Sequence, residues 1–196
     1  MARFRPARGT GRKRTKPLYV IAAEGRVTER IYFESFEPGR NGGFRIDWVS
    51  NPKDRSHPLE VVKRLIQAER DRRGVETRAE YWAVIDRDSW DEADLSKAWA
   101  QIKERGNFHL ALSRPCFELW LYLHLRENRP FCDRQECVRV LTEVCPTYEK
   151  SRYDPALFLG GLADAIRRAR SLDERPEEAW PSQQGSRVYR LAEKLC

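Results

Sequence analysis

The stretch Leu18-Tyr-Val-Ile-Ala-Ala-Glu-Gly25 decides the fold class of this chain. Its run of apolar residues follows Pro17 and stops at an acidic residue and a glycine. A short apolar run with polar ends is typical of a strand buried on both faces, as in a parallel sheet. The later stretch Tyr81-Trp-Ala-Val-Ile-Asp-Arg-Asp88 has the same pattern, so the sequence predicts two such strands.

Helical and strand patterns alternate around these two stretches. Alternating apolar residues predict a strand over 44–50, and a further apolar run predicts one over 108–113. Apolar residues spaced by three or four predict helices between the strands, with Thr28 as the N-cap of the first. These helices are expected over residues 28–36, 59–72 and 92–105. The order β-α-β-α-β-α-β predicts a Rossmann-like α/β domain whose mostly parallel sheet, of about four strands, carries helices on both faces.

From Pro115 onward the pattern becomes helical. Pro115 favours a helix start, here over 115–125. Further helices are expected over 134–145, 155–171 and 186–195. The expected organisation is a disordered basic tail (1–16), an α/β core (17–114) and a helical extension packed on the core (115–196).

Composition narrows the classes of protein that fit. A length of 196 residues suits one domain, and no apolar run reaches the roughly 18 residues of a membrane span. The first residues lack the apolar segment of a secretory signal, so a cytoplasmic location is expected. Five cysteines without a C-x-x-C pair, and only three histidines, argue against structural zinc. No partner histidine is evident for Cys116, which argues against a cysteine nucleophile.

The net charge of +7 is concentrated in the tail. Residues 1–17 contain seven basic residues and no acidic one, while the remainder carries 30 of each. Such a tail can contact phosphate backbones. The alternative is that it only keeps the chain soluble.

Acidic residues follow both apolar strands. Glu24 ends the first strand, and Asp86 and Asp88 end the strand over 81–85. Ligands of open parallel sheets bind at the carboxyl ends of the strands, where these side chains can converge. Carboxylate oxygens suit Mg²⁺ or Mn²⁺. The sequence therefore predicts a metal site formed by Glu24, Asp86 and Asp88, although an Asp after a strand can also simply cap a helix.

These two acidic patterns resemble the two motifs of the Toprim domain. More narrowly, residues 17–196 resemble the RloB family of bacterial defence and restriction-associated proteins. The matching segments are Glu24-Gly-Arg-Val-Thr-Glu-Arg-Ile-Tyr-Phe33, Val84-Ile-Asp-Arg-Asp88, Pro115-Cys-Phe-Glu-Leu-Trp-Leu121 with His124, Tyr148-Glu-Lys150 and Ala165-Ile-Arg-Arg-Ala169. The family usually has asparagine before Pro-Cys-Phe, whereas this chain has Arg114.

The resemblance implies a function and assigns roles. In Toprim enzymes the glutamate acts as general acid or base and the aspartate pair holds Mg²⁺, which maps to Glu24, Asp86 and Asp88. Toprim domains serve topoisomerases, primases and nucleases. The family setting implies phage defence with an ATPase sensor as a possible partner, and RNA, tRNA in particular, as a plausible target.

Other candidates surround this acidic set. Arg26, Lys150 and Arg152 could bind phosphates, although the last two could equally belong to a solvated loop. Glu118 lies in an apolar helix, where a carboxylate needs a partner, so it is expected to support the site by reaching the acidic residues or by pairing with a basic side chain. His124 is a candidate for a residue that supports the site from behind its acidic residues, or for a purely structural role.

The function expected from the sequence is a Mg²⁺-dependent nuclease acting on RNA, tRNA or DNA. The alternative is a non-catalytic module of the same fold that binds nucleic acid or an ATPase. A nucleotide-binding protein is less well supported, because no Gly-x-x-x-x-Gly-Lys or Gly-x-Gly-x-x-Gly run is present. An oligomer is possible.

Overall fold

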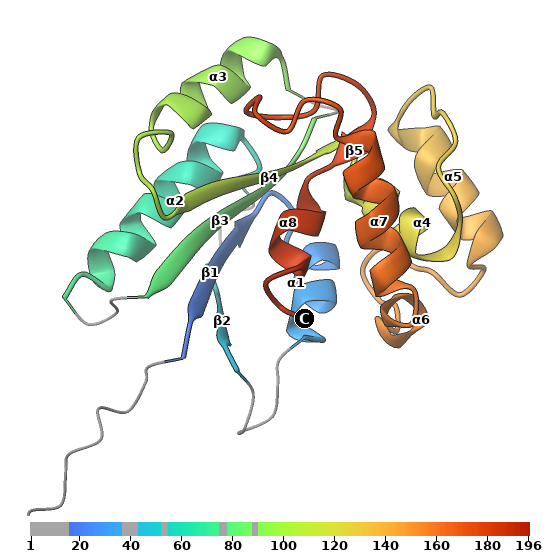
Figure 1. Ribbon diagram of the computed structural model, residues 1–196, viewed down its shortest axis with the longest axis horizontal. Helices are drawn as coiled ribbons and strands as arrows, with labels where there is room; N and C mark the ends of the chain where they lie inside the picture. The colour runs from blue at the N-terminus through green and yellow to red at the C-terminus, as the bar shows by residue number, and fades with distance from the viewer. Residues whose placement is uncertain (1–15, 37–42, 52–54, 75–77, 88–89) are drawn as a thin grey trace, which may run out of the picture.

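A five-stranded sheet organises the molecule (Figure 1). The computed structural model describes residues 16–36, 43–51, 55–74, 78–87 and 90–196. The expected tail therefore lies outside the described residues, except for Lys16. The strand order is β2-β1-β3-β4-β5, and the first four strands are parallel. The strands are β1 Leu18–Ala23, β2 Arg45–Trp48, β3 Ala79–Asp86, β4 Phe108–Arg114 and β5 Gly185–Ser186.

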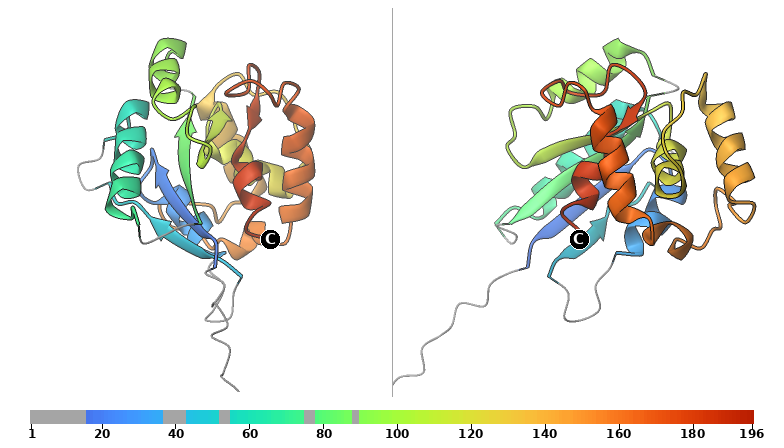
Figure 2. Two further views of the ribbon diagram at one scale, coloured as in Figure 1. Left: turned by 60° about the vertical axis from the view of Figure 1, so that its left-hand side comes forward. Right: turned by 45° about the vertical axis from the view of Figure 1, so that its right-hand side comes forward.

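Helices cover both faces of the sheet (Figure 1 and Figure 2). In the described part of the chain they are α1 Thr28–Glu34, α2 Pro58–Asp71, α3 Glu92–Ala100, α4 Phe117–Leu125, α5 Arg134–Val144, α6 Ala156–Leu159, α7 Leu162–Leu172 and α8 Val188–Ala192. Helices α2 and α3 cover one face, and the others lie on the opposite side. The predicted α/β class with a mostly parallel sheet is thus confirmed. No helix among these is long and apolar enough to span a membrane.

Alternation along the strands divides the core between the two faces. Val20 and Ile85 pack into the cluster under α2 and α3, whereas Ile21 and Val84 pack into the cluster around α4. Successive side chains of a strand point to opposite faces, so Asp86 shares the face of Val84. Each fully buried aliphatic side chain stabilises the fold by about 1.5–3 kcal/mol. The two clusters hold the strand ends, and with them the acidic residues, in fixed positions.

Some local predictions were wrong. Val27, not Thr28, is the N-cap of α1. The helix expected over 155–171 is two helices, α6 and α7, separated at Gly160 and Gly161. A Cβ at Gly161 would lie 2.0 Å from the carbonyl oxygen of His124, so the break lets the backbone pass close to α4.

The segment expected to be wholly helical also contributes a strand. Strand β5 pairs antiparallel with β4, with Ser186 opposite Ser113 and Gly185 opposite Arg114. The serine hydroxyls lie 2.8 Å apart in a buried hydrogen bond. The last helix is accordingly shorter than the expected 186–195.

Candidate functional site at the carboxyl ends of the strands

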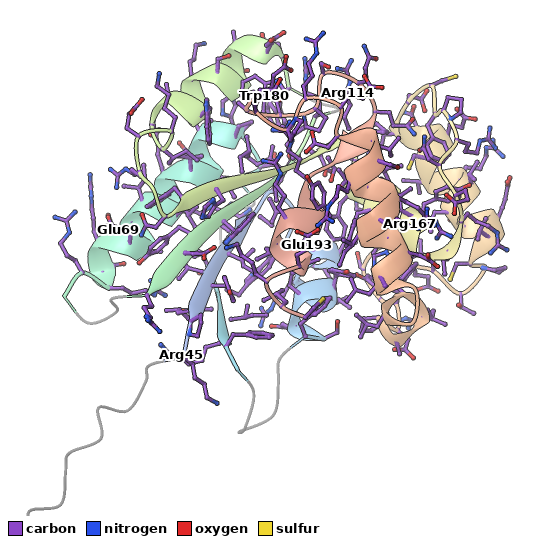
Figure 3. The ribbon with its side chains drawn as sticks, viewed as in Figure 1. Arg45, Glu69, Arg114, Arg167, Trp180 and Glu193 are labelled. Carbon is purple, nitrogen blue, oxygen red and sulfur yellow. The ribbon has the colours of Figure 1, made fainter. Side chains whose placement is uncertain are left out.

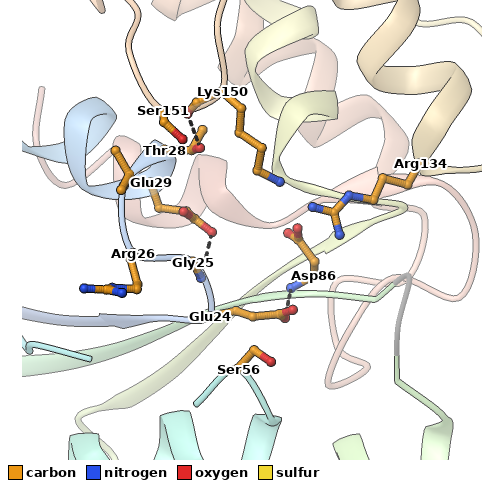
Figure 4. A pocket seen from close by; sticks show the side chains of 11 residues that line it. Glu24, Gly25, Arg26, Thr28, Glu29, Ser56, Asp86, Arg134, Lys150 and Ser151 are labelled. Atoms are coloured by element: carbon orange, nitrogen blue, oxygen red, sulfur yellow. Dashed lines mark hydrogen bonds between the residues drawn. The ribbon is translucent and has the colours of Figure 1, made fainter. Parts of the chain in front are cut away.

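A pocket of about 420 Å³ opens where β1 and β3 end (Figure 4). Its wall combines three carboxylates with three cationic side chains. The lining residues are Glu24, Gly25, Arg26, Val27, Thr28, Glu29, Ser56, Asp86, Arg134, Lys150 and Ser151. Such a mixture is suited to an anionic ligand that also needs acidic side chains nearby. We call this cavity the acidic pocket.

Glu24 and Asp86 meet in this pocket, as the sequence predicted. The backbone N–H of Glu24 donates to the carbonyl of Val84 at 3.0 Å, which continues the β1–β3 pairing past the end of β1. One Glu24 carboxylate oxygen accepts hydrogen bonds from the backbone of Asp86 at 3.2 Å and from the Trp90 indole at 3.0 Å. Asp86 itself is only 6% exposed. Asp88, the third residue of the predicted set, lies outside the described residues.

Glu29 is a further acid of the pocket that the sequence analysis did not single out. It is 5% exposed, and its carboxylate accepts a hydrogen bond from the backbone N–H of Gly25 at 3.2 Å. A Cβ at position 25 would lie 2.3 Å from a Glu29 oxygen, which explains the glycine after Glu24. Burial raises the pKa of Glu29, and the nearby charge of Glu118 raises it further. The sequence signal that could have identified Glu29 is its position four residues after Gly25, in the first turn of the following helix.

Lys150 enters the pocket from the segment between α5 and α6. Its ammonium lies 3.2 Å from a carboxylate oxygen of Glu118, which is 1% exposed, while Lys150 is about half exposed. Tyr148 donates to the same oxygen at 3.4 Å. The Thr28 hydroxyl donates to the Lys150 carbonyl at 2.5 Å and so fastens this segment to α1. Glu118 therefore lies behind the pocket wall and supports Lys150.

Arg134, the first residue of α5, completes the cationic side. It was missed because its position at a helix start, far along the chain from Asp86, carries no sequence signal. Figure 4 shows its guanidinium and the Asp86 carboxylate pointing toward one another. Arg26 lines the opposite part of the pocket and is exposed.

Two predicted residues do not reach the pocket. Arg152 is 85% exposed at its side chain and pairs with Glu149. His124 is buried in the core, with Nδ1 2.8 Å from the Trp120 carbonyl and Nε2 3.0 Å from the Tyr32 hydroxyl. Burial lowers the pKa of His124 to about 4. Because a carbonyl only accepts, Nδ1 carries the proton and Nε2 accepts from the tyrosine, so His124 has a structural role.

The donor set of the pocket suits a hard divalent cation. Among the described residues, no three His, Cys, Asp or Glu side chains gather closely enough to form a metal-ligand group. Mg²⁺, however, usually takes only one or two carboxylates and fills its other positions with water and substrate phosphates. Glu24 and Asp86 are carboxylates of this kind at one strand edge, so the residues fit such an ion.

Comparisons with known proteins place nearly the whole chain in one family. A family model described as "RloB-like protein" matches residues 19–195. No curated protein and no solved structure matches the chain.

Proposed function

This chain belongs to the RloB-like family, and we propose that its acidic pocket makes it a divalent-metal-dependent nuclease that cleaves phosphodiester bonds. The observation that carries this proposal is the meeting of Glu24 and Asp86, from two separate strands, in a pocket that also holds Lys150 and Arg134. The Toprim assignment, and with it a role in phage defence beside an ATPase partner, is part of the proposal. RNA, including tRNA, and DNA are the candidate substrates.

The acids of the pocket would hold the ion. Asp86 and Glu24, with Asp88, are the proposed ligands of Mg²⁺ or Mn²⁺. A bound ion of this kind polarises a phosphate and makes a bound water a stronger nucleophile. Glu24 is held by Asp86 and Trp90, so the carboxylate is oriented before any ligand arrives. Its proposed second role is to move a proton at its carboxylate during cleavage.

The cations of the pocket would hold the substrate. Lys150 and Arg134 project toward the acids, where their charges would stabilise the negative charge that grows on a phosphate during cleavage. Arg26 would contact the adjoining backbone. Lys150 can be positioned in this way because Glu118 and the Thr28 hydrogen bond fix both ends of the residue.

One observation favours the alternative of a non-catalytic module that binds nucleic acid. The pocket already balances its acids with cations, since Glu29, Glu24 and Asp86 face Arg26, Arg134 and Lys150. A pocket balanced in this way could bind an anion without supporting chemistry. This alternative keeps the same surface and predicts binding in the absence of cleavage.

One assay separates the two candidates. Purified protein is incubated with labelled DNA, tRNA and total RNA in Mg²⁺, Mn²⁺ or EDTA, alongside Asp86→Ala. Asp71→Ala is the control, because Asp71 ends α2, where its exposed carboxylate accepts from Gln67. We expect metal-dependent cleavage that Asp86→Ala lowers about 100-fold or more, as several kcal/mol of stabilisation by the ion would be lost.

Each other outcome has a clear meaning. Binding without cleavage under every condition supports the non-catalytic module. Cleavage that persists in EDTA and in Asp86→Ala contradicts both the site and the mechanism.

A further inference from the structure

A second pocket, of about 250 Å³, lies beside the acidic pocket. Its lining residues are Arg87, Arg114, Pro115, Cys132, Asp133 and Arg134. We propose that this arginine pocket binds a backbone phosphate of the same nucleic acid strand, next to the phosphate held in the acidic pocket. The inference rests on the proposed function and adds to it a subsite for the flanking strand.

Arg134 joins the two pockets, because it lines both of them. The strand ends explain the arrangement. Asp86 is the last residue of β3 and pairs with Ser113, so Arg87 and Arg114 are the next residues of two adjacent parallel strands. The backbone N–H of Arg87 donates to the Ser113 carbonyl at 2.8 Å, which keeps the two strands together at this point. A strand of nucleic acid bound at Asp86 would therefore have its neighbouring phosphate at the arginine pocket.

The charge of the arginine pocket is strongly one-sided. In its described lining, the guanidinium groups of Arg87, Arg114 and Arg134 accompany one carboxylate, Asp133, and Arg134 also points toward Asp86 of the acidic pocket (Figure 4). The Asp133 carboxylate already accepts the Glu136 N–H at 2.8 Å as the N-cap of α5. Guanidinium groups present a planar set of donors that matches phosphate oxygens. Like charges held this close repel one another, and a bound anion relieves that repulsion.

Donors remain for a ligand. Within the described part of the chain, the Arg87 guanidinium makes no hydrogen bond or ion pair that would occupy it. Arg114 donates to the Ser182 carbonyl, in the segment that also carries Trp180, and this contact positions it at the end of β4 (Figure 3). That contact uses one N–H group of Arg114, so its other donors can serve a phosphate.

The arginine pocket is suited to binding and not to chemistry. Among its described lining residues the carboxylate is the capping Asp133, whereas the acidic pocket has Glu24, Glu29 and Asp86. A phosphate in the arginine pocket would thus be held and left uncleaved. This gives the substrate a direction, from the acids past Arg134 to Arg87 and Arg114.

The test measures binding apart from cleavage. Arg87→Ala and Arg87→Glu are compared with the wild type for binding to fluorescent oligo(U) and oligo(dT) in EDTA, over a series of salt concentrations. Arg73→Ala is the control, since Arg73 is an exposed arginine next to the end of α2, away from the carboxyl ends of the strands. Thermal unfolding of each variant checks that the fold is intact.

We expect Arg87→Ala to weaken binding about fivefold to tenfold, and the dependence of log affinity on log salt to become shallower by about 0.7 per lost single-strand contact. Arg87→Glu should weaken binding further, and Arg73→Ala should change neither quantity. Unchanged binding in both Arg87 variants overturns the subsite even if the wild type cleaves. Reduced binding in a protein that never cleaves supports the subsite and contradicts the nuclease instead.

Inorganic phosphate separates a backbone ligand from a small anion. Titration with inorganic phosphate alone should give weak binding that Arg87→Ala lowers together with oligonucleotide binding. If Arg87→Ala abolishes phosphate binding and leaves oligonucleotide binding unchanged, the pocket serves a small phosphate and the proposal is overturned.

Discussion

The indole nitrogen of Trp90 lies 3.0 Å from a carboxylate oxygen of Glu24, the same oxygen that accepts from the backbone of Asp86. The segment after β3 therefore fixes the acid at the end of β1. This contact crosses 66 positions of the chain, and it makes the orientation of Glu24 depend on a residue outside the acidic pocket lining.

Trp90→Phe removes the indole donor, keeps a smaller aromatic ring beside His57, and tests this dependence. Because a hydrogen bond to a charged group on a partly exposed side chain contributes about 1 to 1.5 kcal/mol, cleavage should fall about fivefold to tenfold. Affinity for nucleic acid in EDTA should change little. Trp99→Phe, a partly buried tryptophan of α3, is the matched control. Equal activity of both variants would show that the indole contact does not orient Glu24.

Glu29→Gln should change how stability depends on pH. The folded-state pKa of Glu29 is raised above its ordinary value of 4.5, so the ionised form is favoured in the unfolded chain. Stability from this group is complete below pH 4.5 and is lost as the pH rises toward the folded-state pKa. Glutamine keeps the acceptor for Gly25 and carries no charge.

The measurement is chemical denaturation of the wild type and Glu29→Gln between about pH 4 and pH 8, a range that begins near the ordinary pKa of glutamate. The variant should gain stability relative to the wild type as the pH rises above 4.5. Glu34→Gln, a surface change in the same helix, should show no such trend. Two parallel pH profiles for Glu29→Gln and the wild type would mean that the buried carboxyl ionises normally.

The Lys150–Glu118 pair allows stability and function to be separated. Lys150→Met leaves the buried Glu118 carboxylate without its cation and should destabilise the fold by about 1–3 kcal/mol. The double variant Lys150→Met, Glu118→Gln removes that buried charge and should recover most of the loss. Cleavage, however, should remain low in both, because the pocket has lost a cation.

Denaturant unfolding and cleavage rates measured on the same samples test this cycle. Arg152→Met is the control, since Arg152 is exposed and pairs only with Glu149 in the described part of the chain. If the double variant recovered cleavage together with stability, Lys150 would have a structural role and no role in cleavage.

Deletion of residues 1–16 should weaken binding to polyanions without changing the site. The deleted segment carries seven basic residues, and each lost phosphate contact lowers the salt slope by about 0.7 to 0.9. Cleavage of bound substrate at saturation should be unchanged. Binding isotherms over a salt series check this prediction. Identical slopes of log affinity against log salt for the two proteins would mean that the tail only keeps the chain soluble.

The sequence was informative wherever a feature is local. The apolar runs ending at Glu24 and Asp86 identify both the strands and the edge at which their acids meet, because parallel strands all end at one edge. Periodicity likewise places the helices, with errors at their ends where capping residues decide, as at Val27.

Features that depend on distant contacts were missed. Strand β5 has two residues and is held by the contact of Ser186 with Ser113. No local sequence pattern predicts a strand that depends on such a distant contact. Arg134 joins the site only through the packing of α5 beside α4. Lys150 and Arg152 are close in sequence, yet Lys150 lines the acidic pocket, whereas Arg152 is exposed and pairs with Glu149.

The walls of the acidic pocket come from widely separated parts of the chain, which include the end of β1, the end of β3, the start of α5 and the segment around Lys150. A chain divided in the loop between α4 and α5 would therefore give two fragments, one with Glu24 and Asp86 and the other with Arg134 and Lys150. Neither half alone would contain both the acids and the cations Arg134 and Lys150. Reassociation of the two halves would be required to rebuild the pocket, which makes this loop a natural position for a conditional, two-component version of the protein.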